Sequence, residues 1–539
     1  LQTDKNQKLY HALLGILLVC ALAMMMLLSY WACKYSYYGA VDGRTRGVLV
    51  GDKTWAHIAV FLAASLCTIG IDKVLMKKDK SQQEKICLCT LIVTSVIAFI
   101  LGVFYVCKNP YYPVGDQINT TAFAAYCRDG NFIMLSNGGY VGMYQQQKGL
   151  GILYEILFTL FGDFNYRPAK ILHVVWWILT ILAGYGFLKL NTDRPVFRML
   201  YCVMMLGCFP LLFYLPYIYG DVLSISFGII LFYGVAAYEH SGQKRYIALA
   251  SFAAGLAVLA RKNTWIVLVA VAVYALLVSL RKKKVRYLVA GTAILLTAAL
   301  SVKAVDVSYE VRSGYPSGIG IPSILWVAMG LQETEGRAGV YNRYQQATFT
   351  DYDCQQELAA QQGKEYIRER LEEFSQDPGM AFNFFKNKLE GQWIEPMYAA
   401  LESTESFEEG AELSPVLESL YYGELGRTIW KLTNYYQSIL YLTGLMALVM
   451  LGILWWKKKE VPTSLWLPWI AVFGGFLFSI LWEAKSRYVF PYCVFMILYA
   501  PEGLYQMGLL LCKLPKLRKF KKSGHTQDKG EEASLRETA

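Results

Sequence analysis

The sequence predicts an all-α polytopic membrane protein, and three observations lead to this fold class. Of the 539 residues, 55% are hydrophobic and only 17% are charged, whereas soluble domains are about 25% charged. Apolar runs about as long as a bilayer crossing recur along the chain. Lys and Arg gather in the short loops between these runs, which is typical of membrane topology signals.

A membrane-spanning helix needs about 20 apolar residues, and about twelve runs qualify as candidates. The first run is too long for a signal-peptide core and lacks a small-residue cleavage site, so we expect it to remain as a span. A further run, Gly149 to Phe161, has only about 13 residues, which favours an interfacial or re-entrant helix. The expected spans are Leu9 to Trp31, Trp55 to Met76, Ile86 to Cys107, Ala169 to Leu190, Val196 to Tyr217, Val222 to Tyr238, Ile247 to Ala260, Thr264 to Leu280, Tyr287 to Val305, Thr428 to Trp456, Ser464 to Trp482 and Val489 to Cys512.

The basic loops predict the orientation of the chain. They alternate correctly with the spans only if Gly149 to Phe161 does not cross, in agreement with its length. Both termini are then cytoplasmic in a cell (plasma) membrane, and the extracytoplasmic face carries Asp116, Asp221, the loop 306–427 and Glu483 to Arg487. The clusters placed in the cytoplasm are Lys5 and Lys8, Lys77 to Lys80, Lys189 with Arg194 and Arg198, Lys244 and Arg245, Arg281 to Lys284, Lys457 to Lys459, and the tail Lys513 to Lys522.

The spans and loops divide the chain into five segments. Residues 1–85 hold two N-terminal helices, 86–305 a transmembrane module with a long outer loop at 108–168, 306–427 a polar extracytoplasmic lobe, 428–512 the C-terminal helices, and 513–539 a basic and then disordered tail. We expect short interfacial helices within 108–168. In the lobe we expect a helix from Gln355 to Ser375, ended by Asp377-Pro378-Gly379. Arg261-Lys262-Asn263 interrupts the apolar stretch 247–280, which leaves two tight spans and a re-entrant hairpin both open.

Charge and metal-ligating residues exclude two classes of function. The net charge of +11 resides in loops between apolar runs, which argues against nucleic-acid binding. The twelve Cys lie mostly inside apolar runs, where the thiol behaves as a small hydrophobe. With the five His scattered and no Cys pair at zinc spacing, a zinc site is not expected.

Asp116 is the first candidate functional residue. It follows Pro113-Val-Gly115 just after an expected span, where a carboxylate near the bilayer is costly unless it has a role. A turn Asp bonded to its own backbone is the common structural explanation. The functional interpretation is a general base that meets an acceptor hydroxyl.

Further candidates lie on the same predicted face. Asp221 begins a span and suits a helix N-cap, although it could also orient an acceptor or share a metal with Asp116. Arg261, Lys262 and Arg487 violate the positive-inside bias, at a cost of about 2.5 to 3.5 kcal/mol for a charge near the bilayer centre. A polyprenyl phosphate would offset that cost, because guanidinium groups bind phosphate in a bidentate way. The structural alternative for Arg487 is an ion pair with Glu483.

The order of these features resembles the GT-C fold glycosyltransferases. The features are the outer Asp116, a short apolar helix from Gln147, Tyr219-Gly-Asp221, the Arg-Lys-Asn turn, and a final Glu-x-x-x-Arg-Tyr-x-x-Pro from Glu483 to Pro491. The chain looks closest to bacterial relatives of the protein O-mannosyltransferases and the aminoarabinose transferases. The resemblance covers about Ile86 to Cys512 and leaves the first two spans outside it.

The resemblance implies an inverting transfer of one sugar from a polyprenyl-phosphate donor to a glycan, lipid or protein acceptor. Asp116 would be the base and Asp221 a second catalytic residue, while Arg261, Lys262 and Arg487 would bind the donor phosphate. Gln117, Glu483 and Tyr488 would support them, and a lobe segment from Ile321 to Leu331 would cover the acceptor. No cofactor is certain, although Mg or Mn is possible. Many members carry Asp-Glu where this chain has Asp116-Gln117, so an assisting carboxylate is not expected there.

Two other functions compete with this hypothesis. Buried charges also mark the substrate paths of transporters and flippases, but these commonly show repeat symmetry, which this sequence lacks. A polysaccharide polymerase or ligase would share the lipid-linked donor and the outer site. The sequence barely separates that enzyme from a single-sugar transferase.

Overall fold

The computed structural model describes residues 2–38, 47–317, 320–459 and 461–513. Within them, helices form nearly all of the regular structure, and the strands make only two short hairpins. The all-α fold class is therefore confirmed. The tail expected at 513–539 lies outside the described residues, apart from Lys513.

Nine helices of the described residues are long and apolar enough to cross a membrane. A tenth results if Ser486–Met496 and Ala500–Lys513, which meet at a bend of 60°, count as one span. The chain is thus a polytopic membrane protein. The helices concerned are α1 (Gln2–Lys34), α2 (Thr54–Leu75), α3 (Lys80–Lys108), α7 (Arg167–Asn191), α10 (Asp221–Ser241), α12 (Trp265–Lys282, preceded by the 3-10 turn Lys262–Thr264), α13 (Arg286–Ser313), α20 (Glu424–Trp456), α21 (Trp466–Leu481, preceded by Thr463–Leu465) and, in the bent pair, α22 (Ser486–Met496).

Two of the expected spans form shorter helices. The run Val196 to Tyr217 is divided into α8 (Pro195–Leu206) and α9 (Phe209–Phe213), because Gly207 ends the first helix and Pro210 begins the second. Proline lacks the N–H that would continue an α-helix. The run Ile247 to Ala260 forms α11 (Lys244–Ala260), of 17 residues. The total of about twelve spans therefore stays a prediction.

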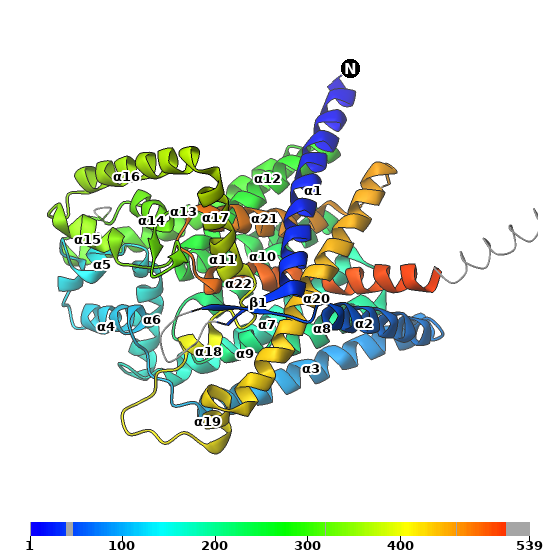
Figure 1. Ribbon diagram of the computed structural model, residues 1–539, viewed down its shortest axis with the longest axis horizontal. Helices are drawn as coiled ribbons and strands as arrows, with labels where there is room; N and C mark the ends of the chain where they lie inside the picture. The colour runs from blue at the N-terminus through cyan, green and yellow to red at the C-terminus, as the bar shows by residue number, and fades with distance from the viewer. Residues whose placement is uncertain (1, 39–46, 318–319, 460, 514–539) are drawn as a thin grey trace, which may run out of the picture.

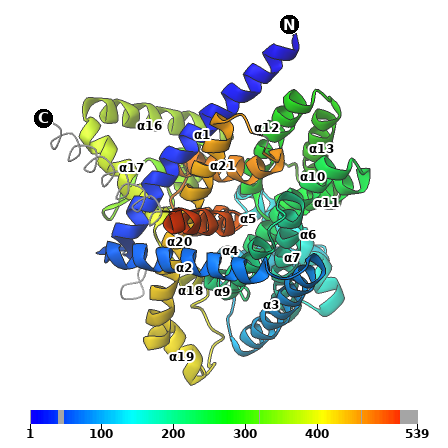
Figure 2. The ribbon, with the colours of Figure 1, turned by 90° about the vertical axis from the view of Figure 1, so that its right-hand side faces the viewer.

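Helices α10 to α13 gather on one side of the molecule, at the right in Figure 2. Helix α11 packs against α10 and α13, and α12 packs against α13 and α21. Arg261 stands at the break between α11 and α12 in an extended conformation. The predicted interruption is therefore a sharp junction between two packed helices.

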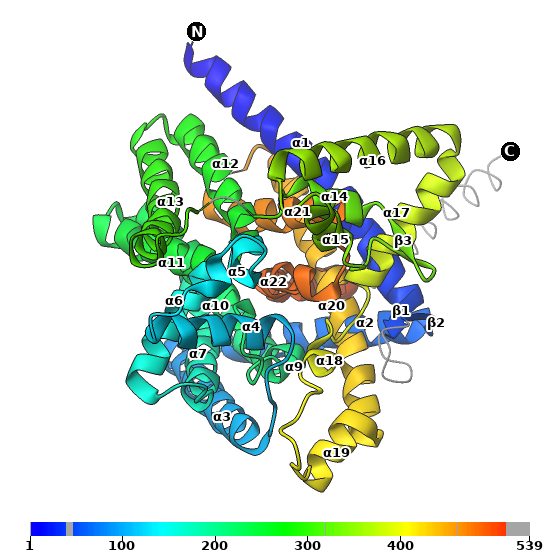
Figure 3. The same cartoon turned by 90° about the vertical axis from the view of Figure 1, so that its left-hand side faces the viewer.

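Parts of the two long segments that were expected outside the cytoplasm meet at one end of the molecule, where α4 to α6 and α14 to α16 lie at the left in Figure 1 and face the viewer in Figure 3. The first comprises α4 (Asp116–Arg128), the 3-10 turn Ile133–Leu135, α5 (Tyr140–Met143) and α6 (Gln147–Phe161). The second comprises α14 (Ile324–Gly330), the hairpin of β3 (Glu333–Thr334) and β4 (Arg337–Ala338), α15 (Tyr344–Asp351), α16 (Gln356–Gln376), α17 (Pro378–Trp393), α18 (Ala400–Ser403) and α19 (Pro415–Tyr422). Helix α16 confirms the helix expected at Gln355 to Ser375. Asp377 then caps α17 by accepting a hydrogen bond of 2.9 Å from the Met380 amide.

The first helices pack against a late part of the chain. Helix α1 runs beside α20, the two lying together in Figures 1 and 2. The Trp455 indole donates a hydrogen bond of 3.2 Å to the His11 carbonyl at one end of this contact. Beyond α1, the antiparallel hairpin of β1 (Tyr35–Tyr38) and β2 (Val48–Gly51) leads into α2, where His57 Nδ1 lies 2.8 Å from the Ser438 hydroxyl of α20.

Candidate active site

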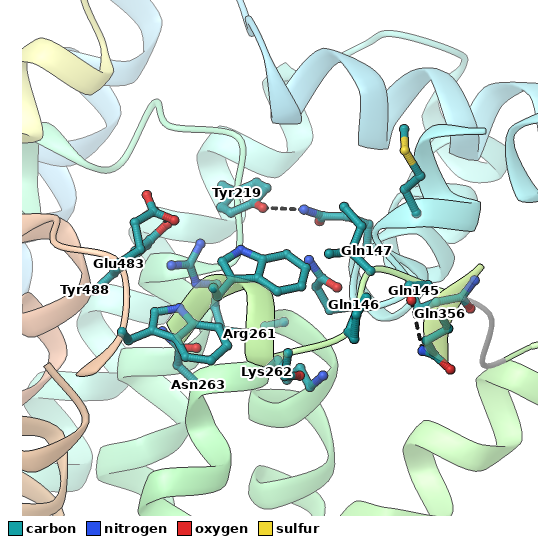
Figure 4. A pocket seen from close by; sticks show the side chains of 18 residues that line it. Gln145, Gln146, Gln147, Tyr219, Arg261, Lys262, Asn263, Gln356, Glu483 and Tyr488 are labelled. Carbon is teal, nitrogen blue, oxygen red and sulfur yellow. Dashed lines mark hydrogen bonds between the residues drawn. The ribbon is translucent and has the colours of Figure 1, made fainter. Parts of the chain in front are cut away.

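Segments far apart in the sequence surround a cavity of about 320 Å³, called here the first cavity. Its wall comes from the start of α6, the loop before α10, the break between α11 and α12, the lobe around α14, and the loop between α21 and α22. Figure 4 shows Arg261 between the glutamines on one side and Glu483 and Tyr488 on the other. The lining residues include Gln145, Gln146, Gln147, Tyr219, Arg261, Lys262, Asn263, Trp326, Gln356, Trp482, Glu483 and Tyr488.

Two glycines bring α6 and the loop before α10 close to the end of α11. A Cβ on Gly149 would lie 2.8 Å from the Cα of Leu259, and a Cβ on Gly220 would lie 2.7 Å from the carbonyl carbon of Ala260. Only glycine permits these backbone approaches without displacing α11. The sequence thus places the ends of three helices around the point where Arg261 emerges.

Arg261 is held by an acid and two aromatic rings. Its Nη2 lies 3.5 Å from Asp221 Oδ1, and its guanidinium carbon lies 4.9 Å from the Tyr219 ring centre and 5.5 Å from that of Tyr488. Cation–π contacts of this kind fix a guanidinium and offset its desolvation. Asp221 is buried and is not among the lining residues, so it orients Arg261.

Lys262 lies where the first cavity adjoins a smaller one. It lines both the first cavity and a neighbouring cavity of about 190 Å³ that also involves Lys148, Val258, Trp265 and Val302. The smaller cavity therefore combines two ammonium groups with an apolar wall from α11 and α13, and Asp306 in its lining lies 3.3 Å from the Lys148 ammonium group. Such an apolar wall suits the hydrocarbon part of a ligand.

Asp116 is exposed at the first residue of α4 and is not among the residues that line the first cavity. The Tyr140 hydroxyl donates a hydrogen bond of 2.8 Å to its Oδ1. The pKa values of Tyr140 and Tyr219 are both raised. Burial is the largest cause, and the negative charge of the Asp116 carboxylate is the second. Asp116 is therefore near enough to act electrostatically on a residue that lines the cavity.

A chain of hydrogen bonds continues from α4 to the cavity wall. The Thr120 hydroxyl lies 2.7 Å from the Asp116 carbonyl and 3.3 Å from Gln147 Oε1. Gln147 Nε2 in turn donates to the Tyr219 hydroxyl at 2.5 Å, as Figure 4 shows. These contacts fix the first turn of α4 relative to the ring that packs on Arg261.

Glu483 supplies a second carboxyl group to the cavity. It is 6% exposed and accepts a hydrogen bond of 3.3 Å from Tyr488. Burial raises the pKa of Glu483 to about 7, and the charge of Asp116 acts in the same direction. A carboxyl with this pKa is able to exchange a proton near neutral pH.

Two predicted site residues lie behind the cavity wall. Arg487 is 6% exposed, donates a hydrogen bond to the Tyr217 hydroxyl, and packs on the rings of Tyr217, Tyr219 and Tyr488. In the described part of the chain it forms no ion pair with Glu483. Gln117 is buried and accepts a hydrogen bond of 2.7 Å from Tyr111. Neither residue is among those that line the first cavity.

Several lining residues were named from the sequence only as parts of longer segments, or not at all. The run Gln145-Gln146-Gln147 lines the cavity at the start of α6. Trp326 and Trp482 also line it, and their ring centres lie 5.9 Å apart with an interplanar angle of 5°. Three consecutive amides at the start of a short apolar helix were a usable signal. Trp326 lies within the lobe segment Ile321 to Leu331 that the resemblance indicated, but its stacking on Trp482 depends on how α14 packs in the folded chain.

The arrangement does not fit a metal shared by Asp116 and Asp221. Arg261 already lies against Asp221, and a divalent cation next to a guanidinium would be repelled. Among the described residues there is no cluster of three or more His, Cys, Asp or Glu side chains that could hold a metal ion.

Comparisons with protein-family models, with curated proteins and with solved structures find no match to this chain.

Proposed function

We propose that the protein is a membrane glycosyltransferase that moves a single sugar from a polyprenyl-phosphate donor to an acceptor hydroxyl, with inversion. The observation that carries this proposal is that Arg261, Lys262 and Glu483 line one cavity, while the charge of Asp116, outside the lining, acts on Glu483 and Tyr219. A phosphate leaving group needs fixed cations, and a hydroxyl nucleophile needs a base. The GT-C resemblance, the plasma-membrane location and the extracytoplasmic orientation belong to the same proposal.

The donor phosphate would bind at Arg261 and Lys262, with its lipid chain along the apolar wall of the adjoining cavity. Arg261 suits this role because Asp221 and the two tyrosines hold its guanidinium in one orientation. Arg487 would act from behind the wall of the first cavity. Its guanidinium packs on the rings of Tyr219 and Tyr488, fixes them, and adds positive potential.

The transfer step would take place between this phosphate and Asp116. The acceptor oxygen attacks the anomeric carbon of the sugar as the bond from that carbon to the phosphate oxygen breaks. Asp116 takes the proton of the hydroxyl, and the polyprenyl phosphate leaves as an anion beside Arg261 and Lys262. One displacement inverts the anomeric configuration, whereas a retaining enzyme needs a carboxylate nucleophile.

Mass spectrometry of the lipids that copurify with the protein tests this proposal. We expect a polyprenyl phosphate or its sugar adduct with the wild type and a smaller amount with Arg261→Gln. Arg128→Gln is the matched control, because Arg128 pairs with Asp163 and does not line the first cavity. Equal amounts in all three proteins, or no polyprenyl lipid in the wild type, would contradict the proposed donor.

A further inference from the structure

A second cavity lies on the other side of the segment from Glu483 to Ser486. Its volume is about 400 Å³, within the range of small-molecule sites, about 300 to 1,000 Å³. Among the described residues, Glu483 alone lines both cavities. The wall of the second cavity also includes Tyr37, Arg337, Tyr341, Lys388, Glu390, Glu395, Glu402 and Lys485.

The partition between the two cavities is fixed to the lobe. The Ala484 amide donates a hydrogen bond of 2.7 Å to the Gly339 carbonyl, next to β4. On α17, the Lys388 ammonium group donates a hydrogen bond of 2.5 Å to the Gly330 carbonyl. The second cavity is therefore built jointly by the lobe and by the loop that carries Glu483.

The two cavities differ in charge. The first presents Arg261 and Lys262 opposite Glu483, which favours an anion. The second mixes carboxyl groups with basic ones. Burial raises the pKa of Glu395 to about 7 and lowers that of Lys388 to about 7, so neither group imposes a full charge there at neutral pH. A phosphate would gain little attraction from a wall of mixed charge, whereas a neutral polar ligand fits such a wall.

Polar groups with unused hydrogen-bonding capacity face this second space. The Arg337 Nε is buried without a hydrogen-bond partner. In the described residues, no hydrogen bond or ion pair engages the side chains of Glu402 and Lys485. A ligand that satisfies an N–H donor and a carboxylate together must both accept and donate, which a hydroxyl group does. Tyr37 and Tyr341 add aromatic faces on which the C–H side of a sugar ring can pack.

We propose that the second cavity binds the acceptor and that this acceptor is a carbohydrate. This inference rests on the proposed function. An acceptor sugar held by Arg337, Glu402 and Tyr341 would extend one hydroxyl past Glu483 to the donor in the first cavity. Glu483 would contact that hydroxyl and hold it beside Asp116. Glu483 would thus supply, from another element, the second carboxyl group that position 117 lacks.

Photo-crosslinking of the full chain in its source cells tests the inference. Tyr341 lines the second cavity but not the first, and Trp326 lines the first but not the second. Each is replaced, in a separate variant, by p-benzoyl-phenylalanine. Tyr341 is 48% exposed, so the larger side chain can be accommodated. Tyr422, which is 56% exposed on α19, is the control position outside both cavities. Captured molecules are identified by mass spectrometry.

We expect a glycan at position 341, a polyprenyl phosphate at position 326, and neither at position 422. Adding Arg337→Gln should lower glycan capture about tenfold, as expected for one lost hydrogen bond to a charged group, and leave lipid capture unchanged. Capture at position 341 of a peptide, of a polyprenyl phosphate, or of no more glycan than at position 422 would overturn the inference. A glycan at 341 without a polyprenyl phosphate at 326 would support the glycan site and overturn the proposed donor.

Discussion

Arg261 Nη2 lies 3.5 Å from Asp221 Oδ1, and the two side chains are 14% and 4% exposed. The pair joins the break after α11 to the first residue of α10. A cation that the sequence places on the unexpected side of the membrane is thus held in place by a carboxylate from a neighbouring helix. Although it is paired, Arg261 remains among the residues that line the first cavity.

A double-mutant cycle measures this coupling. Asp221→Asn and Arg261→Gln should each cost about 3 to 5 kcal/mol of unfolding free energy, because each leaves a buried charge unpaired. The double variant should lose clearly less than the sum. The more exposed pair Arg128 and Asp163 is the control, with a coupling of about 0 to 1 kcal/mol. Additive losses at Arg261 and Asp221 in chemical denaturation would show that the pair does not hold the guanidinium.

Removal of the proposed base should abolish transfer without loss of donor binding. Asp116→Asn should lower the transfer rate by about 10² to 10⁴, the usual contribution of a general base. Tyr140→Phe removes only the hydroxyl that donates to Asp116 Oδ1 and should cost far less. Rates are measured with the wild type and both variants at saturating donor. An Asp116→Asn enzyme that keeps its full rate would refute the assignment.

The apparent affinity for the donor should depend on pH through Glu483. Below its pKa of about 7 the carboxyl is protonated and neutral, and above it the carboxylate repels the donor phosphate in the same cavity. The donor KM should therefore rise by about tenfold as the pH passes 7, which corresponds to about 1.4 kcal/mol of repulsion. Glu483→Gln should keep the low-pH KM throughout. The titratable and charged groups that face Glu483 are Asp116, Arg261, Lys388, Lys485 and Tyr488.

If the donor KM of Glu483→Gln still rose with pH, another of these groups would cause the rise. Lys388→Met is the second variant to measure, because burial lowers the pKa of Lys388 to about 7 as well. Its ammonium group loses charge as the pH rises, and it lies on the side of Glu483 away from the donor. The Lys388→Met variant should therefore keep most of the rise in KM.

The anchor of α6 should be important for stability. Glu155 is 6% exposed and accepts hydrogen bonds of 2.6 Å from Tyr309 and 2.8 Å from Arg312, both on α13. Glu155→Gln should cost about 1 to 3 kcal/mol, because a buried charged hydrogen bond is lost. Glu424→Gln breaks an ion pair with Arg427 in which the Glu424 side chain is 82% exposed, and it should cost less than about 1 kcal/mol. Equal losses in denaturation would contradict the anchoring role.

Sequence patterns predicted the helical class well, because apolar runs are a property of each segment alone. The short helix from Gln147 and the break at Arg261 also follow from local length and charge. The division of the run after Val196 was missed, since Gly207 and Pro210 stop a helix even where the residues remain apolar.

The candidate site was only partly predictable. Misplaced charge pointed to Asp116, Arg261 and Lys262, whereas Glu483 was expected only as a supporting residue. Which cations face the cavity depends on tertiary packing. Arg487 and Arg261 look alike in sequence, but tyrosines from the loop before α10 enclose Arg487, while Asp221 presents Arg261 to the first cavity.

The contact of α1 and α2 with α20 has a consequence for biogenesis. The partners His57 and Ser438 are separated by 381 positions, so the ribosome releases the earliest helices long before their permanent neighbour exists. During that interval their packing faces must be shielded by lipid or by an insertion chaperone. In a nascent chain arrested before α20, crosslinkers on these faces should therefore capture lipid or such a chaperone, whereas in the finished protein they should capture α20.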